Sequence, residues 1–252
     1  MDLKQPVWET QNYYDIAHVA SLDTKHPGIS LLIELAKKSK NILDLGCGDG
    51  TKLSAVAKGK TGTGIDISST AICIARKKYP EHTFLEGNIE KTPFDNESFD
   101  LVYSAFVFEH TRSPEKIIKE AKRILKDNGN LVIICPNYGA PNRASPPFKG
   151  SRFKKFFSGL FVKNDLNWNK VTPIADLKKY DTDWDVTIEP YSLSLEKYLN
   201  NNGFKVIKNI STWEYELGGA KIYQKVFRFL GNLGIYPFRY WSPHIVIQAK
   251  KI

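Results

Sequence analysis

Residues 41–50, with the sequence NILDLGCGDG, constrain the fold of this 252-residue chain more than any other stretch. The apolar run at 42–45 ends at glycine punctuation, which predicts a short buried strand. Gly46, Gly48 and Gly50 then permit a tight turn and let a ligand approach the main chain. Apolar residues recur at helical spacing over 51–57, so a helix is expected to begin at the loop. A strand, a glycine loop and a helix N-terminus together predict a site for a nucleotide-like ligand.

The spacing of the glycines distinguishes between two classes of ligand. Dinucleotide-binding loops have the pattern G-x-G-x-x-G, whereas the glycines here alternate as G-x-G-x-G. Asp44 and Asp49 flank the turn. Carboxylates in that place disfavour a pyrophosphate and favour a ligand with an ammonium or sulfonium charge, and S-adenosylmethionine carries both. The alternative is a chance glycine turn, because short motifs produce false matches.

The next segments repeat the alternation of strand and loop. Residues 61–67 predict a second strand ending in Asp66, an acid that could accept hydrogen bonds from both ribose hydroxyls. Ile67 follows and could lie flat against an adenine ring. The alternatives are a surface acid and a core isoleucine. A third strand is expected to end near Glu86, and a fourth to span residues 100–104.

These blocks resemble the class I S-adenosylmethionine-dependent methyltransferases, and most of all the small-molecule branch that includes the ubiquinone-biosynthesis type. The resemblance lies in residues 43–50, 64–68, 87–90, 93–100, 108–110 and 123–137. It implies an α/β fold with a Rossmann-like, seven-stranded, mostly parallel sheet, an antiparallel last strand and helices on both faces. The fifth strand is expected at 130–135, and we expect an inserted lid after it.

The resemblance assigns roles to individual residues. The glycine loop with Asp44 would hold the methionine end of S-adenosylmethionine, Asp66 would bind the ribose, and Ile67 would pack on adenine. Asn88 stands where the family usually has an aspartate that accepts from the adenine amino group, and an amide oxygen can accept that bond too. The predicted cofactor-binding residues are Asp44, Gly46, Cys47, Gly48, Gly50, Asp66, Ile67, Asn88, Ile89, Ser104 and Phe106, with S-adenosylhomocysteine as the product.

One residue is a candidate for catalysis. Methyl transfer from a sulfonium depends mainly on holding the nucleophile and the methyl group close and aligned. A hydroxyl acceptor also gains from a general base, and His110, just past the fourth strand, is the nearest titratable candidate. The alternatives are that His110 caps the following segment or only lines the pocket. The expected activity is methyl transfer to a small or medium acceptor, with oxygen of a sugar, glycan or phenol-like ring favoured.

Other kinds of site are not predicted. The three cysteines and five histidines show no metal-ligand spacing, so no metal is expected, although alternating Asp181, Asp183 and Asp185 leave a metal loop as an alternative. Unpaired cysteines suit a reducing compartment. The first ten residues lack the apolar core of a signal peptide, and no apolar run reaches membrane-spanning length. We therefore expect a cytoplasmic protein.

Charge divides the chain into two parts. Residues 1–140 hold equal numbers of basic and acidic side chains, so the formal net charge of +9 lies in residues 141–252. We expect a single methyltransferase domain over 1–252, with an N-terminal helical cap at 1–40 and a cofactor-binding core at 41–137. An inserted lid or acceptor region would follow at 138–190, and a C-terminal part at 191–252 would contain a long connection at 211–243.

Basic and aromatic residues interleave in two segments of the second half, at 151–161 and 221–230. They could roof the acceptor pocket, contact an anionic acceptor, touch a membrane surface, or simply pack on the core with solvated cations. The favoured partner is a small molecule or glycan. An RNA or protein methyltransferase and a cofactor-binding module without catalysis are the alternatives. The sequence predicts no oligomeric state.

Overall fold

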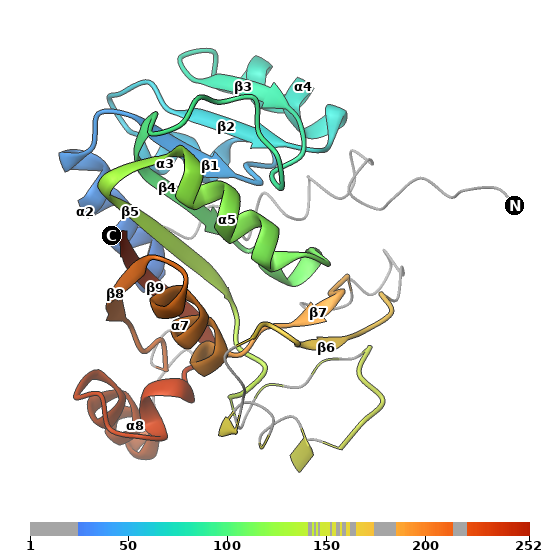
Figure 1. Cartoon of the computed structure of the whole chain (residues 1–252), viewed down its shortest axis with the longest axis vertical. Coiled ribbons are helices and arrows are strands. Elements are labelled where there is room, and N and C mark those ends of the chain that lie inside the picture. The colour runs from blue at the N-terminus through green and yellow to red at the C-terminus, as the bar shows by residue number, and fades with distance from the viewer. Residues whose placement is uncertain are drawn as a thin grey trace, which may run out of the picture.

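The computed structural model describes residues 25–140, 143, 145, 147–151, 153–154, 157, 160–161, 165–173, 185–213 and 221–252. The main sheet has seven strands in the order β3-β2-β1-β4-β5-β9-β8 (Figure 1). Its strands are β1 (Ile42–Leu45), β2 (Thr63–Asp66), β3 (Thr83–Glu86), β4 (Phe99–Ala105), β5 (Leu125–Pro136), β8 (Phe204–Asn209) and β9 (His244–Lys251). The first five pair in parallel, and β9 runs antiparallel to both β5 and β8. The predicted Rossmann-like sheet with an antiparallel last strand is therefore confirmed.

Helices cover both faces of this sheet, as predicted (Figure 1). Successive strand residues point to opposite faces, so Leu131 and Ile133 of β5 join one hydrophobic cluster and Val132 and Ile134 join the other. The first cluster is completed by α5 (Pro114–Ile124) and α7 (Ser192–Asn201). The second is completed by α2 (Pro27–Lys38), α3 (Thr51–Val56) and α4 (Ser69–Lys78). The sheet is thus buried on both sides, which explains its nearly continuous apolar strands.

Strands β5 and β9 extend beyond residues 130–135 and 244–249, over which the sequence pattern predicts them. β5 begins at Leu125 rather than at residue 130, because Leu125 pairs with Phe99 ahead of a register shift. Asn128 has a φ of 61° within that irregular stretch. β9 continues to Lys251, whose Nζ donates to the carbonyl oxygen of Leu125 at 2.8 Å. Polar residues hid both extensions, because their pairing depends on contacts between distant segments.

The segment after β5 packs into the first cluster through its described residues. β6 (Asn169–Lys170) and β7 (Ile188–Glu189) form a two-stranded sheet of their own. Trp168 is buried and donates from Nε1 to Ser194 Oγ on α7 at 2.6 Å. Ile188 and Val186 belong to the same cluster. The described part of the insertion is therefore joined to the core.

The long connection before β9 contains α8 (Ile222–Asn232) and the short η4 (Phe238–Tyr240). Asn137, at the end of β5, donates from Nδ2 to the carbonyl oxygens of Tyr240 and Ser242 at 2.8 and 2.7 Å. Among the described residues, no helix combines the length and apolar character needed to cross a bilayer. Most of the predicted N-terminal cap, residues 1–24, lies outside the described part of the chain.

Candidate functional site

A cavity of about 350 Å³ opens where β1, β2 and β4 end. Ligands of open α/β sheets bind beyond the carboxyl ends of the strands, so its position is that of a binding site. Its walls are formed by Gly46, Cys47, Gly48, Asp49, Lys52, Asp66, Ile67, Asn88, Ile89, Glu90, Ala105, Phe106, Val107, His110, Thr111, Arg112, Ile117 and Asp185. The fold thus gathers nine of the predicted cofactor-site and catalytic residues from four separate loops around one cavity.

The glycine loop forms one wall and depends on residues without a side chain. Gly46, Gly48 and Gly50 have φ values of 83°, 52° and 80°, the left-handed region that favours glycine. The N–H groups of Gly46 and Cys47 both donate to the carbonyl oxygen of Ile65, at 2.8 and 3.1 Å. A Cβ on Gly46 would come within 2.5 Å of Val107 Cγ2. The loop is therefore held in a fixed, tightly packed shape.

Asp66 connects this loop to the end of β2. Its Oδ2 accepts from Gly48 N–H at 2.8 Å, and its Oδ1 accepts from Ser68 N–H at 2.9 Å. Each carboxylate oxygen has a second lone pair, so the same group can accept from ribose hydroxyls. Ile67 follows on the cavity wall with 62% of its surface exposed. An open apolar side chain beside this acid suits an adenine ring rather than the core.

Asn88 and Ile89 lie on the opposite wall, after β3. The Asn88 Oδ1 accepts from Glu90 N–H at 2.8 Å, which sets the side chain in a turn. The second lone pair of that oxygen is available to a further donor. The two residues thus lie on the wall of the cavity to which the resemblance assigned the adenine ring.

Three of the predicted cofactor residues do not line the cavity. Asp44 is 1% exposed and lies beneath the loop. Gly50 is the N-cap residue of α3, and a Cβ added to it would lie 2.7 Å from Phe84 Cζ. Ser104 is buried and donates from Oγ to the carbonyl oxygen of Leu45 at 3.0 Å, which joins β4 to β1. These residues shape the site from behind, whereas the prediction placed them in contact with the ligand.

Lys52 is a cavity residue that the sequence analysis missed. It lies on the first turn of α3, and its Nζ is 5.6 Å from the centre of the Phe106 ring. Burial lowers its pKa, and attraction to Asp44 opposes that shift. Burial conversely raises the pKa of Asp44 to about 7, opposed by Lys52. A lysine one helical turn from a glycine loop is a readable signal for an anionic ligand group.

The residues present fit S-adenosylmethionine. Burial raises the pKa of Asp44, and a cationic group near the glycine loop would favour its charged form. Lys52 provides a cation for a carboxylate, and Asp66 an acceptor for ribose. The exposed Ile67 provides an apolar surface for adenine. The cavity therefore offers a complementary group for each end of that molecule.

His110 ends the short helix η2 (Phe108–His110) and faces the same cavity. Its Nδ1 lies 3.2 Å from the backbone carbonyl oxygen of Asp185. Because a carbonyl only accepts, Nδ1 carries the proton and Nε2 keeps its lone pair in the neutral ring. Glu109 Oε1 lies 3.8 Å from Nε2. The neutral ring thus keeps one nitrogen that can accept a proton, as the predicted role of general base requires.

The end of the insertion positions Asp185 over η2. Thr187 donates through its N–H to the Glu109 carbonyl oxygen at 2.8 Å and through Oγ1 to the Thr111 carbonyl oxygen at 3.0 Å. No group of three metal-binding side chains occurs within the described ranges. The predicted alternative of a metal loop also involves Asp181 and Asp183, which lie outside those ranges. Asp185 instead contacts His110 through its backbone carbonyl oxygen.

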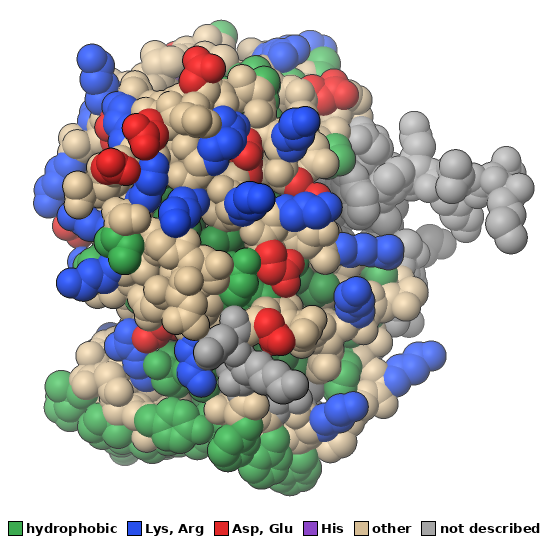
Figure 2. All heavy atoms as spheres, viewed as in Figure 1, with side chains coloured by type: hydrophobic (Ala, Val, Ile, Leu, Met, Phe, Trp, Pro, Cys, Tyr) green, Lys and Arg blue, Asp and Glu red, His purple; other side chains and the backbone are tan. Residues whose placement is uncertain are grey.

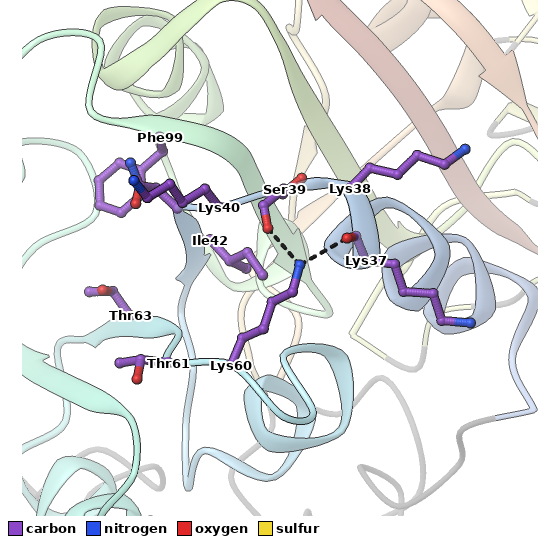
Figure 3. A pocket seen from close by; sticks show the side chains of 10 residues that line it. Lys37, Lys38, Ser39, Lys40, Ile42, Lys60, Thr61, Thr63 and Phe99 are labelled. Atoms are coloured by element: carbon purple, nitrogen blue, oxygen red, sulfur yellow. Dashed lines mark hydrogen bonds between the residues drawn. The ribbon is translucent and has the colours of Figure 1, made fainter.

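A second cavity, of about 680 Å³, lies at the other end of the strands, where β1 and β2 begin (Figure 3). It is rich in lysine, but the Lys60 Nζ donates to the carbonyl oxygens of Ala36, Lys37 and Ser39 at 2.7, 2.9 and 2.9 Å. These carbonyls end α2, so Lys60 caps that helix. The cavity contains none of the predicted site residues.

The two basic, aromatic segments do not roof the cavity in the part of the chain that the structure describes. Of residues 138–190, Asp185 alone contributes to its walls, and residues 221–252 contribute nothing. Tyr236, which follows α8, instead donates from its hydroxyl to the Leu160 carbonyl oxygen at 3.5 Å, which joins the first segment to the chain just after α8. An aromatic roof stays one of the open alternatives, because residues 174–184 and 214–220 lie outside the described ranges.

Comparisons with known proteins agree with this geometry. A family model described as a methyltransferase domain matches residues 43–133. A demethylmenaquinone methyltransferase from Chlorobaculum tepidum is 40% identical over 174 residues, covering 67% of this chain and 67% of that protein. A demethylmenaquinone methyltransferase from Thermotoga maritima is 28% identical over 191 residues, covering 69% of this chain and 82% of that protein. The crystal structure of an S-adenosylmethionine-dependent methyltransferase from Mesorhizobium loti aligns with a TM-score of 0.57 and 17% identity, covering 89% and 96%.

Proposed function

The chain belongs to the class I S-adenosylmethionine-dependent methyltransferases, and we propose that its acceptor is a small aromatic ring bearing a hydroxyl, such as a quinol. The observation that carries the proposal is the position of His110 on the wall of the cavity that also contains the glycine loop, Asp66 and Ile67. A base beside the donor site suits an acceptor whose hydroxyl must lose a proton. The name shared by the Chlorobaculum tepidum and Thermotoga maritima relatives supports a quinone-type ring.

S-adenosylmethionine supplies an electrophilic methyl group on its sulfonium. His110 Nε2 takes the hydroxyl proton, and the resulting phenolate is nucleophilic at oxygen and at the adjacent ring carbons. Asp185 holds the Nδ1 proton through its carbonyl oxygen, so the ring keeps the required tautomer. Glu109, 3.8 Å from Nε2, stabilises the imidazolium that forms. The apolar side chains of Ile117 and Val107 on the wall suit the ring itself.

The test is a methyl-transfer assay with labelled S-adenosylmethionine and three acceptors: a reduced naphthoquinone, a simple catechol and a sugar mixture. We expect label in the quinol or the catechol. His110→Ala should lose turnover at least about a hundredfold while calorimetry gives an unchanged Kd for S-adenosylmethionine. Label in the sugar alone, or unchanged turnover of His110→Ala, contradicts the proposal.

Asn88→Asp serves as the matched control, because it alters the cofactor wall and leaves the base in place. A charged acceptor binds more strongly than a neutral one, so we expect a Kd for S-adenosylmethionine lower by about fivefold. Turnover at saturating cofactor should be unchanged. The two variants thus separate donor binding from acceptor activation.

We also propose that the protein acts in the cytoplasm. Cys47, Cys73 and Cys135 are all free thiols, which suits a reducing compartment. The charge of the second half leaves an RNA methyltransferase as the competing activity. Label transferred to RNA in the same assay, with none in the quinol or catechol, would favour it.

A further inference from the structure

Helix α8 presents a continuous apolar stripe to solvent. Ile222, Val226, Phe229 and Leu233 are spaced so that they share one helical face. Between 47% and 83% of their surfaces are exposed. Hydrophobic side chains gather along the lower edge of the molecule over this helix (Figure 2). An uncovered stripe of this kind marks an interaction surface.

The packing on the opposite side of α8 fixes this orientation. Phe227 lies in an aromatic cluster, with its ring centre 5.6 Å from that of Trp213 and 5.0 Å from that of Phe238. Gln224 and Gly231 are buried on the same side. A Cβ on Gly231 would come within 2.9 Å of the Phe238 carbonyl oxygen, so helix and η4 are in close contact. The stripe therefore cannot turn inward by rotating the helix.

A neighbouring segment extends the surface. Phe153, Phe157 and Phe161 are between 52% and 76% exposed, and the rings of Phe157 and Phe161 stack with centres 6.0 Å apart. The Tyr236 hydroxyl bonds to the Leu160 carbonyl oxygen, which places this segment beside the end of α8. The two groups of side chains, together with Ile235 and Tyr236, form what we term the apolar edge.

Among the described residues of the apolar edge and of α8, the charged side chains are basic. Lys221, Lys225 and Arg228 are exposed on α8, and Lys154 is exposed beside Phe153. The sequence contains no acidic residue from 221 to 252 or from 138 to 161. A two-fold contact between copies of the chain would set these cations against one another. A surface of anionic headgroups complements both the charge and the apolar side chains.

We propose that the apolar edge docks on the surface of an anionic lipid bilayer. The aromatic and aliphatic side chains enter the boundary between headgroups and acyl chains, and Lys225 with its neighbours contacts lipid phosphates. The helix lies in the plane of the interface and does not cross it. This function is separate from methyl transfer, because no described residue of the apolar edge lines the catalytic cavity.

The test is vesicle flotation of the full chain. Vesicles of phosphatidylcholine alone are compared with equimolar phosphatidylcholine and phosphatidylglycerol, each at low and high salt. We expect binding to the anionic vesicles that weakens as salt increases. Phe229→Ser with Leu233→Ser should weaken binding at least about tenfold, and Lys225→Gln about fivefold. Ile252→Ser, which removes an equally exposed side chain elsewhere, should bind as the unsubstituted chain does.

The substituted side chains are exposed, so the variants should keep the thermal midpoint and the affinity for S-adenosylmethionine of the unsubstituted chain. Three results overturn the proposal. The first is vesicle binding that the double serine variant does not weaken. The second is a dimer in sedimentation velocity that the double variant dissociates, without vesicle binding. The third is salt-sensitive binding to tRNA that Lys225→Gln weakens, again without vesicle binding.

Discussion

At the scale of single residues, we propose that Lys52 supplies a positive charge for the carboxylate of S-adenosylmethionine. Lys52 lines the cavity beside Phe106 and above the buried Asp44. We predict that Lys52→Met raises the Kd for S-adenosylmethionine by about ten- to a hundredfold, because a charged hydrogen bond to the methionine carboxylate is lost. Isothermal titration calorimetry measures this. Lys58→Met, on an exposed lysine just after the same helix, should leave the Kd unchanged, and an equal loss in both variants would contradict the assignment.

Asp44 should make the stability of the ligand-free protein depend on pH. Burial raises its pKa from 3.8 to about 7, so the folded state binds this proton more tightly than the unfolded state does. Its contribution to stability is therefore complete below the ordinary pKa and is lost as pH rises through the folded pKa. Relative to the unsubstituted chain, Asp44→Asn should gain up to about 4 kcal/mol in free energy of unfolding between about pH 4 and about pH 8.

Denaturant titrations across that pH range measure the difference, and Asp49→Asn is the control of opposite sign. Burial alone would raise the pKa of Asp49, but hydrogen bonds from Thr51 and Lys78 outweigh it and hold the pKa below its usual value. That carboxylate stabilises the fold at neutral pH, so its removal should destabilise the protein. If the difference in free energy of unfolding between Asp44→Asn and the unsubstituted chain does not vary with pH, the pKa of Asp44 is not raised in the folded state.

Many of the residues that the sequence predicts for the site line one cavity, because the signals that point to them are local. The glycines, Asp66 and Ile67 follow directly from strand ends and loop spacing, and all but Gly50 line the cavity. The contact between Asp185 and His110 could not be predicted from local sequence signals, because 75 residues separate the two positions.

At the scale of elements, the turn between β1 and α3 depends on two separate constraints at Gly46. Its φ of 83° costs a side chain about 1 kcal/mol, and a Cβ would clash with Val107. We predict that Gly46→Ala lowers the free energy of unfolding by about 3 kcal/mol. At Gly59, φ is 77° and no atom lies within 4 Å of an added Cβ. Gly59→Ala should therefore cost only about 1 kcal/mol, the amount that the positive φ imposes. Chemical denaturation measures both.

A double variant separates the two constraints. Val107→Ala removes the two carbons that approach Gly46 most closely and leaves Val107 Cβ at 3.1 Å. Relative to Val107→Ala alone, adding Gly46→Ala should then cost about as much as Gly59→Ala. If the cost stays near that of the single Gly46 variant, contact with Val107 is not its cause.

The positions of the first five strands could be predicted because apolar runs report burial directly, and the mostly parallel sheet was implied by the family resemblance. The structure departs from the pattern where polar residues pair with distant partners. Lys126 and Asp100 form an ion pair at 2.8 Å at the irregular start of β5, and Lys251 continues β9 through a bond to Leu125. Interleaved basic and aromatic residues were equally ambiguous, because the helical spacing of α8 fits a buried face and an exposed one alike.

At the scale of the whole molecule, two surfaces of one fold are separated. The candidate cofactor cavity lies at the ends of β1, β2 and β4, whereas the apolar edge lies on α8 and the segment before β6. The insertion after β5 reaches both, because Phe153, Phe157 and Phe161 belong to the edge and Asp185 lines the cavity. We therefore expect the insertion to fold as part of one domain spanning 1–252.

Trp168 tests that expectation, since it joins the insertion to α7. It is 6% exposed, belongs to the first hydrophobic cluster and donates to Ser194 Oγ at 2.6 Å. We predict that Trp168→Ala lowers the free energy of unfolding of the whole chain by about 4 kcal/mol. Far-UV circular dichroism and the loss of S-adenosylmethionine binding should still give one coincident transition. Trp168→Phe keeps most of the ring contacts and should lose about 1 kcal/mol, the value of the single hydrogen bond. If Trp168→Ala leaves the main transition unchanged and only exposes the insertion to protease, the insertion is a separate folding unit.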